Sequence, residues 1–331
     1  MTDLVCLGDG RPIHAEAITV AEELGIRVHV IEQGYLRPGW LTVEPGGTGG
    51  YSQFPRTSEA IRALATGEVG CAPRYHAGFT NYAAMDVAWN LANLFAGVVG
   101  YRHYRRHALK HVLWEWIGWL GKAFKWPVRS HRDASAMERA LHHRGPLFLL
   151  ALQLETDFQI RLHGPSGGQR PQLLKVLESF ATSAPADALL VVKRHPLDDG
   201  ITPWGRLIRK TASALGIADR CPFLTGGDLG QLLESCNGVV TVNSTVGLTA
   251  LRSGVPVHAL GRAIYRVAGL TDSGPLSDFW VDPRPPDAEL CDALVDALAA
   301  TIQVPGGFDG EGARPGADAM AERILCPVFN P

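Results

Sequence analysis

A short apolar run that ends in a basic corner sets the strongest constraint on how this chain can fold. The run is Leu189–Val192, and Lys193, Arg194, His195 and Pro196 follow it. Such a run is typical of a strand in a parallel sheet that is covered on both faces. Pro196 has no N–H for the ladder, so the strand ends before it. The cations therefore lie at the carboxyl end of a strand, where open α/β sheets bind ligands, and they suit a phosphate. The alternative for this stretch alone is a strand end with solvated charges.

Apolar runs of strand length alternate with helical patterns along most of the chain, which predicts an α/β fold. Near the start, the runs 4–7 and 28–32 flank a helical pattern at 13–24 that Gly25 ends, and together they form a Rossmann-like half. Further strands are expected at 148–152, 189–196, 219–224, 238–242 and 255–260, and further helices at 83–100, 169–182, 204–215, 246–253 and 286–302, before a Pro/Gly-rich tail.

The polar stretch 127–145 separates these two groups of elements, and we expect it to cross between domains. The predicted domains are residues 1–145 and 146–331, two Rossmann-like domains with parallel sheets that face each other across a cleft. The segment 33–40 follows the second strand and is rich in groups that bind sugars and anions. The segment 44–52 is too glycine-rich for regular structure, and its backbone can approach a ligand closely.

Composition excludes several classes of function. The 331 residues are 46% hydrophobic and 19% charged with a net charge of −2, so we expect a globular protein that binds no nucleic acid. Six cysteines without CxxC spacing argue against a zinc site or a disulfide framework. The start resembles no secretory signal and no stretch is apolar enough to span a bilayer, so the expected location is the cytoplasm.

The segment from residue 101 to 126 combines basic and aromatic side chains. Its cations and imidazoles are Arg102, His103, Arg105, Arg106, His107, Lys110, His111, Lys122 and Lys125, and its aromatic residues include Trp114, Trp116, Trp119, Phe124 and Trp126. This mixture resembles an interfacial helix that lies on anionic lipid. The alternative, which is the commoner case for aromatic residues, is a helix that packs its tryptophans into the core of the first domain and exposes its cations.

A second polar strand end follows the run 238–242. Asn243, Ser244 and Thr245 are favoured N-cap residues, and here they stand between a strand and a helix. The N–H groups and the positive end of the helix dipole then point into the crevice that also receives His195. A phosphate finds hydroxyl, amide and backbone donors there. For the tripeptide alone, a purely structural cap remains the alternative.

Carboxylates follow two of the predicted strands. Asp157 and Glu155 follow the run 148–152, where a carboxylate can attack an anomeric carbon or accept a proton from an incoming hydroxyl. The alternative is a solvated loop carboxylate or a helix N-cap. Glu32 ends a strand in the other domain, and it forms an acid/base pair with Asp157 if the two domains face each other.

Five stretches of the chain match a known family in combination. They are Gly34-Tyr35-Leu36-Arg37-Pro38, Gln153-x-x-x-Asp157, Lys193-x-His195-Pro196, Asn243-Ser244-Thr245-Val246-Gly247-x-x-Ala250-Leu251, and Gly269-Leu270-Thr271 up to Phe279-Trp280. The chain resembles the capsule polysaccharide synthesis family, which contains the retaining β-Kdo transferases of Gram-negative bacteria. Those enzymes build a β-Kdo linker on phosphatidylglycerol, and this chain resembles a single transferase module.

The resemblance implies a GT-B-like fold, CMP-β-Kdo as the donor, and no metal or other cofactor. It implies that Asp157 attacks the Kdo anomeric carbon and holds a covalent Kdo, while His195 and Lys193 bind the CMP phosphate. It also implies a catalytic role for His195 in handling the covalent intermediate. Glu32 is the candidate acid/base for the acceptor hydroxyl. Further donor-binding candidates are Pro196, Asn243, Ser244, Thr245 and Gln153, and the acceptor-binding candidates are Tyr35 and Arg37.

The resemblance also implies partners and a location. The acceptor is phosphatidylglycerol or Kdo-phosphatidylglycerol, so the enzyme acts as a peripheral protein at the inner face of the cytoplasmic membrane, beside capsule assembly and export proteins. Two alternatives stay open. One is another CMP-sugar or CDP-polyol transferase, and the other is a non-catalytic capsule assembly subunit that binds a nucleotide or a glycolipid.

Overall fold

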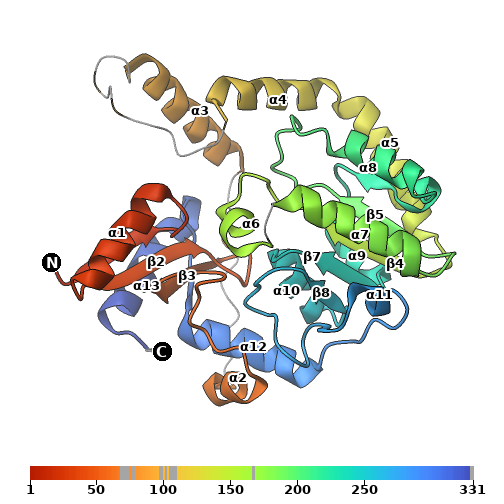
Figure 1. Cartoon of the computed structure of the whole chain (residues 1–331). Coiled ribbons are helices and arrows are strands. Elements are labelled where there is room, and N and C mark those ends of the chain that lie inside the picture. Colours follow the sequence, from red (N-terminus) through yellow and green to blue (C-terminus); the bar gives the residue numbers. More distant parts are fainter. Residues whose placement is uncertain are drawn as a thin grey trace. The chain divides into compact units, whose positions relative to one another are not determined.

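The computed structural model describes residues 1–67, 75, 79–96, 100, 103, 110–165 and 168–328, and Figure 1 shows its elements. The chain divides into two compact units. Unit 1 comprises Met1–Gln53, Thr66–Val112 and Asp296–Pro331, and unit 2 comprises Phe54–Ala65 and Leu113–Val295. This division differs from the predicted boundary between residues 145 and 146. The stretch 127–145 lies in unit 2, and the C-terminal segment returns to unit 1.

Unit 2 is built on a five-stranded sheet with the order β6-β5-β4-β7-β8. Its strands are β4 (Leu147–Ala151), β5 (Leu189–Lys193), β6 (Phe223–Leu224), β7 (Gly238–Thr241) and β8 (Val257–Ala259). Every pair is parallel, and Leu149 lies beside Val191 on one side and Val239 on the other. All residues of the three central strands are buried, as the uninterrupted apolar runs predict. The parallel sheet predicted for this part of the chain is confirmed.

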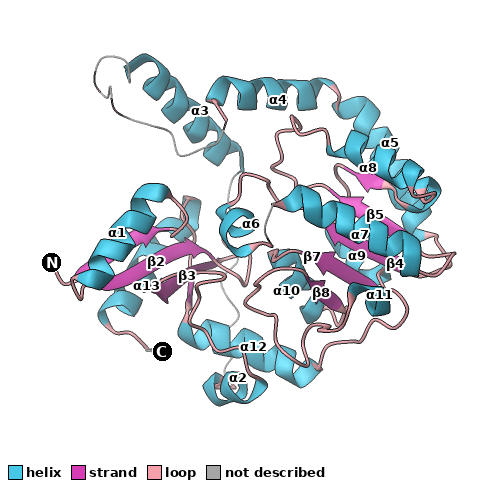
Figure 2. Cartoon of the chain, viewed as in Figure 1, coloured by secondary structure: helices cyan, strands magenta, loops and turns pink. Residues whose placement is uncertain are grey.

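Helices lie on both faces of this sheet (Figure 2). The helices of unit 2 include α5 (Trp126–Leu141), α7 (Gln169–Ser183), α8 (Trp204–Ala214), α9 (Leu229–Ser235), α10 (Thr245–Arg252) and α11 (Leu276–Phe279), with the shorter α2 (Ser58–Leu64) and α6 (Phe158–His163). The main core joins alternate residues of β4 and β5 to α7 and α8, with Phe148, Phe180 and Trp280 at its centre. Trp280 stands edge-on to both phenylalanines, at ring-centroid distances of 5.0 and 5.3 Å. The polar stretch 127–145 is mostly α5, which packs against β6 and α9 instead of crossing between domains.

Unit 1 holds a mixed four-stranded sheet with the order β1-β2-β3-β9. Its elements are β1 (Asp3–Leu7), α1 (Pro12–Glu23), β2 (Arg27–Gln33), β3 (Trp40–Pro45), α3 (Phe79–Ala96), β9 (Gln303–Pro305) and α13 (Ala313–Leu325), and α12 (Ala288–Thr301) leads into β9. The predicted strand–helix–strand unit is present, with β1 and β2 parallel. The prediction of a parallel sheet fails beyond that pair, because β3 and β9 are both antiparallel to their neighbours.

The Pro/Gly-rich tail of the sequence is structured in unit 1. β9 adds to the edge of β3, and α13 packs its apolar side chains on Leu41 and Val43 of β3. A Cβ on Gly316 of α13 would lie 2.8 Å from a methyl carbon of Leu41, so the close approach of this helix depends on glycine. The last part of the chain therefore completes the first sheet.

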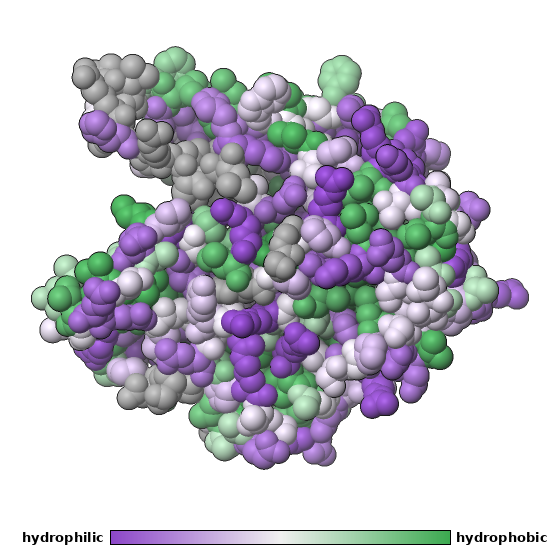
Figure 3. Space-filling view, viewed as in Figure 1, coloured by the Kyte–Doolittle hydropathy of each residue, from purple (hydrophilic) through white to green (hydrophobic). Residues whose placement is uncertain are grey.

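Trp114 and Phe124 of α4 (Val112–Phe124) and Trp126 at the start of α5 are largely exposed. The exposed fraction is 61% for Trp114, 91% for Phe124 and 68% for Trp126. The alternative of tryptophans buried in the core of the first domain is therefore wrong for these side chains. Figure 3 shows apolar side chains among polar ones along the upper edge, where α3 and α4 lie. The predicted basic residues Arg102 and Arg105–His107 lie outside the described residues. None of the helices in the described ranges is long and apolar enough to cross a membrane.

Candidate functional site

The predicted donor-binding residues follow three adjacent strands of unit 2. Because the strands are parallel, the loops after β4, β5 and β7 leave the sheet at one edge. The chain runs from β4 outward to β5 and β6, then returns to β7 and β8 on the other side of β4. The topological switch point therefore lies between β4 and β7, and doubly wound sheets bind ligands outside the strand ends at such a point.

A pair of side-chain amides joins the loops on either side of this switch point. Gln153 Nε2 donates to Asn243 Oδ1 at 2.8 Å, and the Asn243 backbone N–H donates to Gln153 Oε1 at 3.1 Å. Gln169 of α7 bonds the backbone N–H and C=O of Gln153 with its own amide. Gln153 is buried, so these bonds satisfy groups that are expensive to leave unpaired. The two amides hold the loops in place, and their contact with a donor stays a prediction.

Asp157 ends the loop after β4 as the N-cap of α6. Its Oδ1 accepts a hydrogen bond from Gln159 N at 2.9 Å, which matches the capping alternative. The cap fixes the orientation of a half-exposed carboxylate, and the nucleophilic role stays a prediction. Glu155, in the same loop, accepts a hydrogen bond from the Thr202 hydroxyl at 3.1 Å and so links the loops after β4 and β5.

The side chains of the basic corner after β5 differ in their hydrogen-bond partners and in their burial. His195 Nδ1 accepts the Leu197 N–H at 3.1 Å, which leaves the proton of a neutral imidazole on Nε2. Lys193 is buried, and its Nζ donates to the carbonyls of Gly226 and Gly227 at 2.6 and 2.9 Å. Burial lowers the pKa of Lys193, while the more distant charges of Asp133 and Asp228 act in the opposite direction. Lys193 therefore secures the turn after β6, and its contact with a phosphate stays a prediction.

The start of α10 has the predicted capping geometry. The Ser244 side chain accepts from Val246 N at 3.2 Å, and Thr245 is the first helical residue. The Tyr265 hydroxyl donates to the Ser244 carbonyl at 2.6 Å. A Cβ on Gly247 would collide with the Tyr265 hydroxyl, so only glycine fits against this buried ring. This packing fixes the N-terminus of α10 at the sheet edge, with its dipole directed outward.

Unit 1 has its own polar cluster at the carboxyl ends of β1 and β2. Glu32 Oε2 accepts from the Thr48 hydroxyl at 3.0 Å. Asp9, which follows β1, accepts from Thr48 N at 2.7 Å. The glycine-rich segment 44–52 therefore carries the hydrogen-bond donors that hold these two carboxylates. Glu32 and Asp157 belong to different units, and their pairing stays a prediction.

Glu44 of β3 is a third carboxyl group in this cluster and is almost fully buried. It accepts hydrogen bonds from the Tyr35 hydroxyl, at 2.8 Å, and from the Ser52 hydroxyl. Burial raises the pKa of Glu44 to about 8, the charges of Glu32 and Asp9 add to the rise, and the two hydroxyls oppose it. Near neutral pH the cluster thus holds a buried carboxylic acid that is close enough to Glu32 and Asp9 for their charges to raise its pKa.

The predicted acceptor-binding residues lie at the edge of this cluster. The Tyr35 hydroxyl accepts from Gly49 N at 2.8 Å while it donates to Glu44. Burial raises the pKa of Tyr35 well above its ordinary value, and the charges of Glu44 and Glu32 add to the effect. Arg37 is exposed, and its Nε donates to the Gly34 carbonyl at 2.9 Å.

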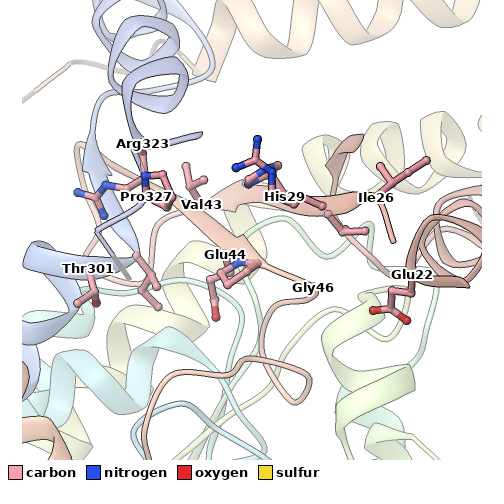
Figure 4. A pocket seen from close by; sticks show the side chains of 13 residues that line it. Glu22, Ile26, His29, Val43, Glu44, Gly46, Thr301, Arg323 and Pro327 are labelled. Carbon is pink, nitrogen blue, oxygen red and sulfur yellow. The ribbon is translucent and has the colours of Figure 1, made fainter. Parts of the chain in front are cut away.

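A cavity of about 200 Å³ adjoins this cluster in unit 1 and is lined by residues such as His29, Val43, Glu44 and Arg323 (Figure 4). In Figure 4 the Glu44 carboxyl group and the His29 ring lie on opposite sides of the ribbon. None of the predicted site residues lines this cavity. No group of three or more metal-binding side chains is found in the part of the chain that the structure describes, and the prediction of a metal-independent enzyme remains untested.

Sequence reasoning missed Glu44 and Asp9. The segment 40–45 reads as a loop because a proline and a glycine precede it and glycines follow it. Apolar Leu41 and Val43 nevertheless alternate with Thr42 and Glu44, and this period of two is typical of a strand. That alternation is the signal that could have identified the segment as a strand. In the structure, the register between β2 and β3 places Glu44 on the same sheet face as Glu32.

Comparison with known proteins identifies the family. Residues 2–308 match the family described as capsule polysaccharide biosynthesis protein. The chain belongs to this family. The resemblance predicted from the five sequence stretches is therefore confirmed.

Individual relatives are similar to this chain over most of its length. The capsule polysaccharide modification protein LipB of Neisseria meningitidis serogroup A is 33% identical over 313 residues, which are 92% of this chain and 74% of that protein. The capsule polysaccharide export protein KpsS of Escherichia coli is 32% identical over 306 residues, 91% of this chain and 77% of that protein. Among solved structures, the β-Kdo 2,7 transferase KpsC of Thermosulfurimonas dismutans matches 98% of this chain and 84% of its own, with 17% identity and a TM-score of 0.47.

Proposed function

We propose that this capsule polysaccharide biosynthesis protein is a retaining glycosyltransferase of GT-B type that transfers Kdo from CMP-β-Kdo to a lipid-linked acceptor. The observation that carries the proposal is the meeting of three loops at one edge of the unit 2 sheet. They bring a carboxylate, an imidazole and a capped helix N-terminus to the ends of β4, β5 and β7, three adjacent strands of which β4 and β7 flank the switch point. The imidazole and the helix N-terminus can stabilise the charge of a phosphate leaving group, and the carboxylate can attack the anomeric carbon of a sugar.

The proposed reaction is a double displacement. An Asp157 oxygen forms a bond to the anomeric carbon while the bond from that carbon to the phosphate oxygen breaks, and CMP leaves with the electron pair. The acceptor hydroxyl then attacks the same carbon, gives its proton to a carboxylate base for which Glu32 is the candidate, and releases Asp157. Two inversions give net retention. His195 with Nε2–H, Ser244 and the N–H groups of α10 would stabilise the charge on CMP.

Trapping of the covalent intermediate is the most direct test. Intact-protein mass spectrometry after incubation with CMP-β-Kdo, without acceptor, should show one added Kdo. Asp157→Asn should remove the adduct and the turnover. Asparagine is as good an N-cap as aspartate, so this variant keeps the cap of α6 and removes only the nucleophilic carboxylate.

Glu155→Gln is the matched control, because it neutralises a carboxylate in the same loop and should retain the adduct. Full turnover by Asp157→Asn would show that the carboxylate is only a cap and would refute the double displacement. Replacement of CMP-β-Kdo by CMP-sialic acid or a CDP-polyol tests the alternative of a different donor. Absence of turnover with all of these donors would favour the non-catalytic assembly subunit.

We also propose that the enzyme works as a peripheral protein on the cytoplasmic face of the membrane. The exposed aromatic side chains of α4 and of the start of α5 support this location, since such side chains favour the headgroup region of a bilayer. The acceptor would then be reached from the membrane surface.

A further inference from the structure

A strongly cationic cavity lies within unit 2, at the end of the sheet formed by β5 and β6. Its volume is about 490 Å³, and its walls come from α5, the segment after β5, α8 and β6. The strand order places this end of the sheet beyond β4, away from the switch point between β4 and β7. None of the predicted catalytic, donor-binding or acceptor-binding residues lines it, although Arg194 belongs to the basic corner after β5. The cations that do are Lys125, Arg129, Arg132, Arg194, Arg206 and Arg209.

The cavity has little negative charge of its own. The one carboxylate among its lining residues is Asp133, which already accepts from the backbone N–H and the hydroxyl of Thr225 at 3.0 and 2.6 Å. Arg194 pairs with Asp198 at 3.8 Å, which is longer than a hydrogen bond. Six cations therefore converge on a space whose only carboxylate is already hydrogen-bonded.

Three of the residues that line this cavity each carry a buried N–H donor with no acceptor among the described residues. These donors are Arg194 Nε, Arg129 Nη1 and Trp204 Nε1. Arg194 is 5% exposed and Trp204 is 1% exposed, so solvent does not satisfy them freely. An unpaired buried donor costs about 1–3 kcal/mol, and more when it is charged. Three such donors in the walls of one cavity, together with its six cations, favour a ligand with several acceptor oxygens.

A neighbouring cavity of about 410 Å³ extends the same positive region. It shares Arg129 and Arg194 with the first cavity and adds Lys122 and the predicted donor-binding residue Pro196. Burial lowers the pKa of Lys122 to about 8, and the charge of Arg194 contributes to this shift while Asp198 opposes it. Lys122 Nζ donates to the carbonyls of Pro196 and Asp198, so this cation is held in place.

We infer that the cavity lined by these six cations is a second anion-binding site, which takes the phosphate group of an organic phosphate. Arginine guanidinium groups bind phosphate oxygens in pairs, and buried donors strengthen such contacts. The volume is larger than one phosphate needs, so part of the attached organic group also fits. The phosphate can come from a phospholipid headgroup or from a free phosphorylated compound. The inference does not depend on the proposed transferase activity.

Binding measurements on the full chain without donor sugar test the inference. Isothermal titration calorimetry with glycerol 3-phosphate and co-sedimentation with phosphatidylglycerol or phosphatidylcholine vesicles separate the two sources. We expect a saturable site for at least one phosphate source. Arg209→Ala should weaken it about tenfold, because it removes one charge-assisted contact. Arg209 is exposed on α8, so this variant should fold normally.

Lys210→Ala is the matched control, since Lys210 is an exposed cation beside Arg209 that does not line the cavity. It should leave the affinity within about twofold, the range expected for a distant surface charge. Equal loss in both variants, or no binding of either source, would overturn the inference. Excess CMP should not displace the ligand. Displacement by CMP would show that the cavity belongs to the donor site and would also overturn the proposal of a separate site.

Discussion

Replacement of Glu44 by glutamine should change how the stability of the protein depends on pH. The Glu44 pKa rises from an ordinary 4.5 to about 8 in the folded protein. Below pH 4.5 the carboxyl group is protonated in the folded and unfolded states, and its full contribution to stability is present. Between pH 4.5 and 8 only the unfolded state releases the proton, so stability falls as pH rises. Above pH 8 the folded state must hold a buried carboxylate.

The size of this effect follows from the shift of the pKa. A rise from 4.5 to about 8 corresponds to about 5 kcal/mol of unfolding free energy, most of which is lost between pH 5 and pH 9. Glutamine cannot ionise, yet its side-chain oxygen can still accept from Tyr35 or Ser52. The Glu44→Gln variant should therefore be much less sensitive to pH, and its stability relative to the wild type should rise by about 4 kcal/mol over that range.

Urea unfolding followed by circular dichroism at several pH values between 5 and 9 measures the effect. Glu16→Gln, at an exposed position of α1, is the matched control and should follow the wild type at every pH. Parallel pH profiles for Glu44→Gln and the wild type would refute the reasoning. Such a result would mean that Glu44 is ionised in the folded protein, and that the hydroxyls of Tyr35 and Ser52 outweigh burial.

Three further predictions concern packing, the loops and the membrane. Gly247→Ala should destabilise unit 2 by about 1–3 kcal/mol in a urea titration, because its Cβ would collide with the Tyr265 ring; wild-type stability would refute this. Asn243→Ala should cost about 1–3 kcal/mol, because the buried Gln153 amide loses its partner; a change below about 0.5 kcal/mol would show that water replaces it. Phe124→Ser should reduce co-sedimentation with phosphatidylglycerol vesicles without lowering the melting temperature, and unchanged binding would contradict membrane contact by α4.

The α/β class and most of unit 2 were predictable from sequence because each strand is a continuous apolar run. Leu189–Val192 illustrates this, since burial on both faces leaves a signal that needs no knowledge of the neighbouring strands. The polar residues after β5 and β7 could be placed on one sheet edge by the same logic. Their individual contacts could not be predicted. For example, the hydrogen bond between Gln153 and Asn243 joins residues that are 90 positions apart, and no local sequence pattern reveals such a pair.

The missed elements have specific physical causes. β3 lies between turn residues and pairs with β9, whose residues come more than 250 positions later, so no local pattern reveals the partner. α13 begins with Ala313, Arg314, Pro315 and Gly316, and a proline in the first turn does not break a helix. The cationic cavity was missed because its arginines come from α5, the segment after β5 and α8, which meet only in the folded chain.

The return of β9 and α13 to the first sheet has a consequence for synthesis on the ribosome. The apolar side of β3 and its outer backbone edge are complete only when residues 303–325 have emerged. Residues 113–295 can by then have left the exit tunnel and assembled their parallel sheet. The strands β1–β3 of the first sheet would thus be synthesised first, but their sheet would be completed last. The open edge of β3 would need protection from other nascent chains in the interval.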